Sequence, residues 1–266
     1  MERRLDTEEF IIDLFCRVDH AMAGVPKRSD ASLWPGEIAT LGVLFALRGT
    51  SERAFDRWLR RQWLMLFPRL PHRTRLFRLF ATHADWTDRF LARPSFFGIA
   101  DSYGIELINT RRLKRSPRQI AKRGKCGGRW IAGVKWGLVI NNRGRVCAWD
   151  VTTANVYDAN AFAPLIEKYA KKMIVLADGN FHKSEHHRKN DHDPPNLKVC
   201  PRGWWNQRRL IETVLSMLQR VCRLKHLSER TWPAVRAHLG FVAMAFNLLT
   251  RWTGRNVRLS IAQFAL

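Results

Sequence analysis

The stretch "MIVLADGNFHK", residues 173–183, places an acidic residue directly after a short apolar run. A run of this length is typical of a buried strand. Asp178 follows the run, and Gly179 and Asn180 come next, which are residues that favour a turn. We therefore expect a carboxylate where a buried strand ends, in a chain whose formal net charge is +23.

The same arrangement occurs in "SFFGIADSYGIELI", residues 95–108, where Asp101 follows an apolar run. The segment "WIAGVKWGLVINNRGRVCAWDVTT", residues 130–153, predicts two strands joined at an Asn-Arg-Gly turn. The elements predicted after these strands are a helix over residues 158–172 capped by Asp158, a strand over residues 173–177 and a long helix over residues 206–224. Three strands in a meander, then a helix, then a short strand is the order of ribonuclease-H-like folds, in which the first and fourth strands are neighbours. We expect an α/β fold with a ribonuclease-H-like mixed sheet flanked by helices.

The first part of the chain predicts helices instead. Apolar residues recur at helical spacing in "EEFIIDLFCRVDHAM", residues 8–22, and Ser51 is a favourable N-cap after Gly49. We expect a small all-α N-terminal domain over residues 1–94, followed by the ribonuclease-H-like domain with C-terminal helices over residues 95–266. Such a bundle can hold a DNA-binding helix-turn-helix, although packing alone also explains the pattern.

The composition favours a folded protein with a polyanionic partner. Hydrophobic residues make up 46% of the chain, and there are 11 tryptophans, which argues against disorder. The charge of +23 favours nucleic acid as the partner. No apolar run approaches the roughly 20 residues of a membrane-spanning helix, and the N-terminus has no signal-peptide core. The five cysteines are scattered singly, which predicts free thiols and a reducing compartment such as the cytoplasm.

The acids following the two strands predict a metal site. If the first and fourth strands pair, Asp101 and Asp178 reach the same end of the sheet, where their charges repel unless a cation neutralises them. Oxygen ligands favour Mg²⁺ or Mn²⁺ over Zn²⁺. A zinc reading of His182, His186 and Cys200 is disfavoured, because their spacing matches no closed four-ligand site.

A third acid is predicted on the long helix. Glu212 is the only acid on the polar stripe opposite an apolar face. Two interpretations remain open on the helix pattern alone, a solvated glutamate paired with Arg208 one turn away and a further metal ligand.

These residues together resemble the DDE transposases of bacterial insertion sequences over about residues 95–250. The matching features are Asp101 in "IADSYGIELI", the Lys135-bearing strand pair in "GVKWGLVINNRGRVCAWDVTTANVYD", Asp178 in "VLADGNF" and Glu212 in "RRLIETVLSML". The interval from Asp178 to Glu212 lies within the family's range. The resemblance implies that Asp101, Asp178 and Glu212 hold two Mg²⁺ ions, with Mn²⁺ as a substitute, for DNA cleavage and strand transfer without a covalent enzyme intermediate.

The family's signature around the glutamate is Tyr, two residues, Arg, three residues, Glu, six residues, Lys. Trp205, Arg208 and Glu212 occupy the first three places, and Gln219 stands at the place of the lysine. The phosphate contact that the family's lysine makes can pass to Arg220, and Trp205 can stack on a base.

A basic segment follows the first strand and predicts DNA contacts. Between Glu106 and Asp150 the sequence has no acid, while residues 111–129 are rich in lysine and arginine, which favours a phosphate-contacting loop over a merely solvated one. The predicted DNA-binding residues are Arg111, Arg112, Arg129, Lys135, Trp205, Arg208 and Arg220. The partners implied by the resemblance are the element ends and target DNA, and pairing two ends implies a homodimer. The alternatives are a metal-dependent DNA nuclease without joining activity and a catalytically inactive, transposase-derived DNA-binding protein.

Overall fold

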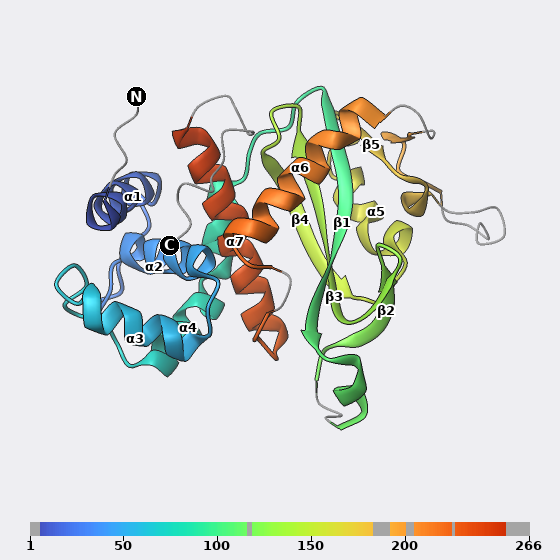
Figure 1. Ribbon diagram of the computed structural model, residues 1–266. Helices are drawn as coiled ribbons and strands as arrows, with labels where there is room; N and C mark the ends of the chain where they lie inside the picture. Colours follow the sequence, from blue (N-terminus) through green and yellow to red (C-terminus); the bar gives the residue numbers. More distant parts are fainter. Residues whose placement is uncertain (1–5, 116–118, 183–191, 201–204, 225–226, 254–266) are drawn as a thin grey trace.

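The structure is a computed structural model that describes residues 6–115, 119–182, 192–200, 205–224 and 227–253. Figure 1 shows a group of helices from the N-terminal part of the chain beside a twisted sheet, with the long helix α7 between them. The mixed α/β sheet flanked by helices, preceded by a helical region, confirms the predicted fold class.

The N-terminal region is helical, as the sequence predicts. Its elements are α1 (Thr7–Ala21), α2 (Pro35–Arg48), α3 (Glu52–Gln62), α4 (Arg73–Thr82) and the 3₁₀ helix η1 (Ala84–Phe90). Gly49 ends α2 in the left-handed conformation at φ 53°, where a side chain is disfavoured. Ser51 caps α3, because its hydroxyl oxygen accepts a hydrogen bond from the Ala54 backbone N–H.

The sheet contains both predicted and unpredicted strands. They are β1 (Phe97–Ile108), β2 (Lys122–Cys126), β3 (Arg129–Asn141), β4 (Val146–Thr153), β5 (Ile174–Ala177) and β6 (Leu197–Val199). The path through the sheet is β2-β3-β1-β5-β6, and β4 also pairs with β3. β1 and β5 are parallel neighbours, which confirms the predicted pairing of the first and fourth strands. β2 and β6 were not predicted from the sequence.

Helices cover both faces of the sheet. On one face, Ile99, Ile105 and Leu107 of β1 belong to the larger hydrophobic core. That core also holds side chains of α6 (Trp205–Val221) and α7 (Trp232–Trp252). On the other face, Ala100 and Val139 belong to a second core with α5 (Asp158–Glu167). Successive residues of β1 therefore point to opposite layers, as strand geometry requires.

α7 connects the N-terminal helices to the sheet, and it contacts α2, α4, η1 and β4. At Gly42 of α2 an added Cβ would lie 2.3 Å from the Phe241 ring, so this crossing depends on glycine. The buried Asn247 amide donates to Phe90 O (3.0 Å) and Val146 O (2.8 Å) and accepts from Val146 N (2.9 Å). One continuous core therefore runs from α1 to the sheet. Within the described residues, no helix is long and apolar enough to cross a membrane.

Candidate active site

Asp101 and Asp178 lie at the same level on neighbouring parallel strands. Ile99 of β1 pairs with Leu176 of β5, and each aspartate comes two residues later on its strand. Asp178 directly follows β5, and its backbone is still extended at φ −81° and ψ 175°. The register therefore continues to the two aspartates, on strands about 4.8 Å apart.

Both aspartates belong to the face of the sheet that α6 covers. Asp101 lies two residues after Ile99 and four before Ile105 on β1, so it points to the same face as these two residues of the larger core. Its partner on β3, Leu138, belongs to that core too. Ala177 points into the α5 layer, so the next residue, Asp178, points the other way. The two carboxylates therefore share one face and one edge.

Local hydrogen bonds fix the two carboxylates. Asp101 Oδ1 accepts from the Ser102 backbone N–H (2.7 Å). Asp178 caps the 3₁₀ turn η3 (Gly179–Phe181), accepting from Asn180 N (3.0 Å) and from Asn180 Nδ2 (3.1 Å). Phe181 is buried in the α5 layer, and this anchors the turn that orients Asp178.

A buried ion pair lies under Asp101, on the opposite face of the sheet. Lys135 Nζ lies 2.8 Å from Asp158 Oδ1 and donates to Val156 O at 2.9 Å, and both charged side chains are 9% exposed. The Ser102 hydroxyl donates to the second oxygen of Asp158 at 2.9 Å. The residue after Asp101 is thereby tied to the start of α5.

This network changes two assignments made from the sequence. Helix α5 begins at Asp158 with Tyr157 as its N-cap, so the predicted capping role of Asp158 is wrong. Lys135 is buried on the face away from the two aspartates, and its ammonium has internal partners. A DNA phosphate on the α6 side cannot reach this ammonium, and Lys135 is not carried into the proposed DNA contact.

Glu212 lies on the helix that covers this face. Ile211 and Val214, which flank Glu212 in α6, are fully buried, and α6 contacts β1. These two residues therefore hold the helix against the sheet. Glu212 itself is exposed. Figure 1 shows α6 crossing in front of the sheet. All three predicted acids therefore lie on the α6 side of the sheet.

The described residues contain no group of three His, Cys, Asp or Glu side chains close enough to hold a metal ion. The structure thus brings Asp101 and Asp178 together and leaves Glu212 on the same face without closing the group. Asp101 and Asp178 offer only carboxylate oxygens as metal ligands, and these suit Mg²⁺ or Mn²⁺.

Tyr103 is the next residue of β1 on the same face as Asp101. Burial raises the pKa of the Tyr103 phenol, and the nearby charge of Arg129 lowers it by a smaller amount. The phenol is therefore protonated at neutral pH and available as a hydrogen-bond donor. The sequence pattern alone did not indicate Tyr103, because a tyrosine is ordinary in a strand.

The basic segment forms a charged surface along one edge of the sheet, which we name the basic edge. It comprises Arg111, Arg112, Lys114 and Arg115 of η2 (Thr110–Arg115), Lys122, Arg123 and Lys125 of β2, and Arg129 of β3, all exposed. The Arg123 guanidinium lies over the exposed Trp130 ring, 4.7 Å from its centroid. β1 continues from Asp101 to Ile108, so η2 begins roughly 23 Å from Asp101, measured along the strand.

The remaining predicted DNA contacts come from α6. Arg220 is exposed, about 12 Å along the helix from Glu212. Trp205 and Arg208 belong to α6, but their side chains lie outside the described part of the chain. Of the histidines in the disfavoured zinc reading, His186 also lies outside it, and His182 contacts the Asp193 carboxylate.

Residues 92–184 match the family model described as "Transposase DDE domain". The matched range contains Asp101 and Asp178, together with Ser102, Lys135 and Asp158, and it ends before Glu212. No curated protein matches the chain.

Proposed function

With residues 92–184 identified as a transposase DDE domain, we propose that this protein is the transposase of a bacterial insertion sequence. It binds the ends of the element, cuts the DNA there and joins the freed ends to target DNA. The observation that carries the proposal is the pairing of Asp101 and Asp178 at one level of two parallel strands, on the face covered by α6.

In this proposal Asp101, Asp178 and Glu212 hold two divalent cations. Such ions, when bound, activate the attacking oxygen and neutralise the charge of the leaving oxygen. Local backbone hydrogen bonds orient Asp101 within β1 and Asp178 at the start of η3, whereas Glu212 is carried by a helix. In this proposal α6 moves on DNA binding so that Glu212 reaches the aspartate pair.

The reaction is phosphoryl transfer in two balanced steps. In the first step, the oxygen of water attacks a phosphodiester phosphorus at the element end, the P–O3′ bond breaks, and a 3′-hydroxyl is released. In the second step, the oxygen of that 3′-hydroxyl attacks the phosphorus of a target phosphodiester. A P–O bond to the element end forms, the target's own P–O3′ bond breaks, and the target strand leaves with a free 3′-hydroxyl. One P–O bond forms for each that breaks, so joining needs no external energy source.

The DNA follows the α6 face and the basic edge. Arg111, Arg112 and Arg129 contact phosphates beyond the cut, and Arg220 with Trp205 and Arg208 contacts the strand near Glu212. The charge supports this path, because the basic edge has no acid between Glu106 and Asp150. In the cell the protein would act in the cytoplasm on nucleoid DNA, as a homodimer that holds two ends.

A strand-transfer assay tests the function. The ends are first identified as short inverted repeats flanking the coding region. Labelled end duplexes are then incubated with the protein, a plasmid and Mg²⁺. We expect labelled DNA covalently joined to the plasmid, and no product with a chelator. Cleavage without joined product would identify the nuclease alternative, and specific binding with neither product would identify the inactive DNA-binding protein.

A further inference from the structure

A second group of arginines lies at the end of the sheet opposite to η2, and none of them was among the DNA contacts predicted from the sequence. Its members are Arg93 before β1, Arg143 and Arg145 in the turn between β3 and β4, and Arg251 near the end of α7. We name this group the arginine patch. Arg145 is half-buried and the other three are exposed. Figure 1 shows the β3–β4 turn and the C-terminal end of α7 at the upper end of the molecule, and η2 at its lower end.

Hydrogen bonds to the backbone join the three segments that carry the arginine patch. The Asn141 amide donates to Arg93 O at 3.1 Å, which ties the segment before β1 to the turn. Arg145 Nη2 donates to Thr250 O of α7 at 3.5 Å. Arg251 Nη2 donates to a carbonyl of the segment that follows η1 at 3.3 Å. The four arginines therefore come from distant parts of the chain and belong to one surface.

The arginine patch concentrates positive charge without carboxylate partners. Burial is the main cause that lowers the pKa of Arg145, and the neighbouring charges of Arg251 and Arg143 lower it further. Among the described residues, no ion pair joins any of the four arginines to a carboxylate. Residues 253–266, which follow α7, contain no acid in their sequence. Repulsion between like charges opposes folding, so a bound polyanion would remove a cost that the fold itself leaves uncompensated.

Two exposed aromatic rings lie beside the arginine patch. Phe96 is 68% exposed and Phe97 is 49% exposed, and their rings are nearly perpendicular with centroids 4.7 Å apart. The Asn142 backbone N–H donates to the Ser95 hydroxyl oxygen at 3.0 Å, which holds this segment against the β3–β4 turn. Phe97 comes two residues before Ile99 on β1 and therefore points to the α6 face. Exposed aromatic rings beside cations favour nucleic acid over an acidic protein.

The acids lie between the arginine patch and the basic edge. Gly98 of β1 pairs with Asn141, the last residue of β3 before the turn. The turn is therefore about 10 Å from Asp101 along the strand, and η2 begins roughly 23 Å from Asp101 in the other direction. Arg251 is carried by α7, which shares the larger core with α6. A DNA duplex that crosses the acids from the basic edge would thus reach the arginine patch next.

We propose that the arginine patch binds the DNA that flanks the element, on the side of the cut away from the basic edge. The guanidiniums contact the backbone phosphates of the flank, and Phe97 lies against the bases next to the cut. This assignment rests on the proposed function, because it takes Asp101 and Asp178 as the place of the cut. It follows from the continuity of the uncut DNA, which must extend past the scissile phosphate.

Fluorescence anisotropy on the full-length protein tests the surface with two labelled end duplexes, one that includes flanking DNA and one that stops at the cut. A chelator is present, so that neither duplex is cleaved. The readout is the ratio of the two affinities. Changing Arg143 and Arg251 together to glutamine should weaken the flanked duplex about tenfold and leave the other duplex unchanged. The slope of log affinity against log salt should fall by about 1.8 on the flanked duplex only.

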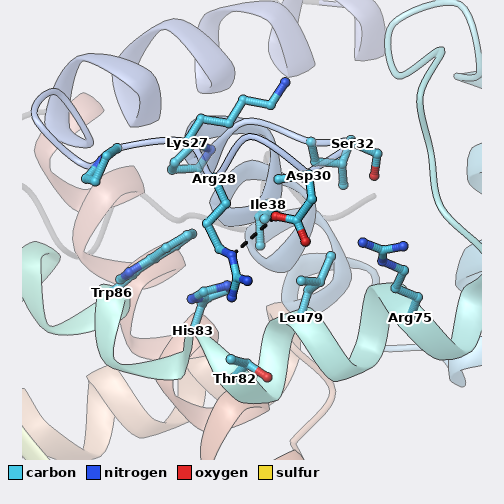
Figure 2. A pocket seen from close by; sticks show the side chains of 14 residues that line it. Lys27, Arg28, Asp30, Ser32, Ile38, Arg75, Leu79, Thr82, His83 and Trp86 are labelled. Carbon is cyan, nitrogen blue, oxygen red and sulfur yellow. Dashed lines mark ion pairs between the residues drawn. The ribbon is translucent and has the colours of Figure 1, made fainter.

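The matched control changes two exposed arginines of α4, Arg75 and Arg78, to glutamine. Arg75 lines a pocket between α4 and the connection before α2 (Figure 2), away from the turn between β3 and β4. The control should keep the wild-type ratio of the two affinities. Arg143→Gln alone, in an exposed turn, should lower the ratio by a smaller factor than the double change, which guards against a folding defect from Arg251→Gln.

Three results would overturn the flank site. They are a wild-type ratio in the double variant, an equal loss of both duplexes in that variant, and release of the flanked duplex by polyglutamate as readily as by unlabelled DNA. An equal loss would indicate contact with the element or a general charge effect, and the polyglutamate result would indicate a surface for any polyanion. All these readouts measure binding without cleavage, so a negative strand-transfer assay would contradict the proposed function and leave them unchanged.

Discussion

Asp178 is held in place by the turn that it starts, since Asn180 donates to both of its oxygens and Phe181 anchors the turn in the α5 layer. Asp101 has a similar local bond from Ser102. The position of each acid is thus set by a few residues of local sequence, and for this reason the apolar runs before Asp101 and Asp178 sufficed to predict both.

Asp178→Asn should abolish cleavage while preserving DNA binding. The amide keeps the size of the side chain and removes the charge that holds the metal, so the cleavage rate should fall at least about a thousandfold. The measurement is cleavage of labelled end duplexes with Mg²⁺, beside a binding assay on the same DNA.

Asp150→Asn is the matched control, because Asp150 is a half-buried acid paired with Arg236. It should cut at nearly the wild-type rate. Cleavage at the wild-type rate by Asp178→Asn would contradict the assignment of Asp178.

Lys135 could not be assigned correctly from its sequence context. From Ile131 to Asn141, β3 is buried on both faces, so apolar residues show no alternation that would tell which way Lys135 points. Its partner Asp158 lies on a different element, and only the tertiary pairing shows that the ammonium is neutralised inside the protein.

Lys135→Met should destabilise the fold by about 3–5 kcal/mol, since it leaves the Asp158 carboxylate buried without its cation. Urea unfolding measures the loss. Lys172→Met, an exposed substitution of the same kind, should change stability by less than about 0.5 kcal/mol. An equal effect of the two substitutions would contradict the buried pair, whereas adding Asp158→Asn to Lys135→Met should recover part of the loss.

At the scale of elements, the strands with apolar patterns were predicted and the charged or very short ones were not. β2 reads "KRGKC" and gains its strand conformation from pairing with β3. β6 is three residues long and depends on β5. Neither has a local signal, because backbone pairing with a distant segment stabilises both.

Element η2 should bind DNA through charge alone. Changing Arg111, Arg112 and Lys114 to glutamine should weaken binding similarly on all sequences, and the slope of log affinity against log salt should fall by about 0.9 for each lost phosphate contact. Fluorescence anisotropy over a salt series, on cognate and unrelated duplexes, gives both quantities.

The matched control removes three exposed lysines, Lys168, Lys171 and Lys172, that follow α5 or lie at its end. This change should leave the slope near the wild-type value. A loss confined to the cognate end would instead indicate that η2 reads bases.

For the whole molecule, the packing of α7 on the N-terminal helices could not be predicted from the sequence. The change of pattern near residue 94 suggested two domains, and that division remains a proposal. α7 belongs to the second part by sequence, yet it packs on α2 and α4 of the first part. The arrangement follows from long-range packing at sites such as Gly42 against Phe241, which periodicity does not encode.

A buried acid should make the stability of this assembly depend on pH. Glu229 Oε1 lies 2.6 Å from His238 Nδ1 of α7, and the His238 ring lies 4.8 Å from the Phe45 ring of α2. Burial alone would raise the pKa of Glu229, but the contact with His238 lowers it overall. A lowered pKa in the folded state stabilises the protein above the ordinary glutamate pKa of about 4.3, and this contribution is lost as pH falls further.

Urea unfolding between about pH 3 and pH 6 measures this dependence. Glu229→Gln should flatten the rise of the unfolding free energy over that range. Glu167→Gln, which changes an exposed glutamate at the end of α5, should leave it as in the wild type. An unchanged slope in Glu229→Gln would show that Glu229 does not titrate with unfolding.

Strand β2 also affects how the protein behaves without DNA. It forms an edge of the sheet, and strand edges can recruit the edge of another molecule and start aggregation. Lys122, Arg123 and Lys125 are exposed along this edge, and their mutual repulsion between molecules opposes such pairing. Removing these charges would therefore lower solubility as well as DNA affinity, and purification at low salt should keep the protein in solution.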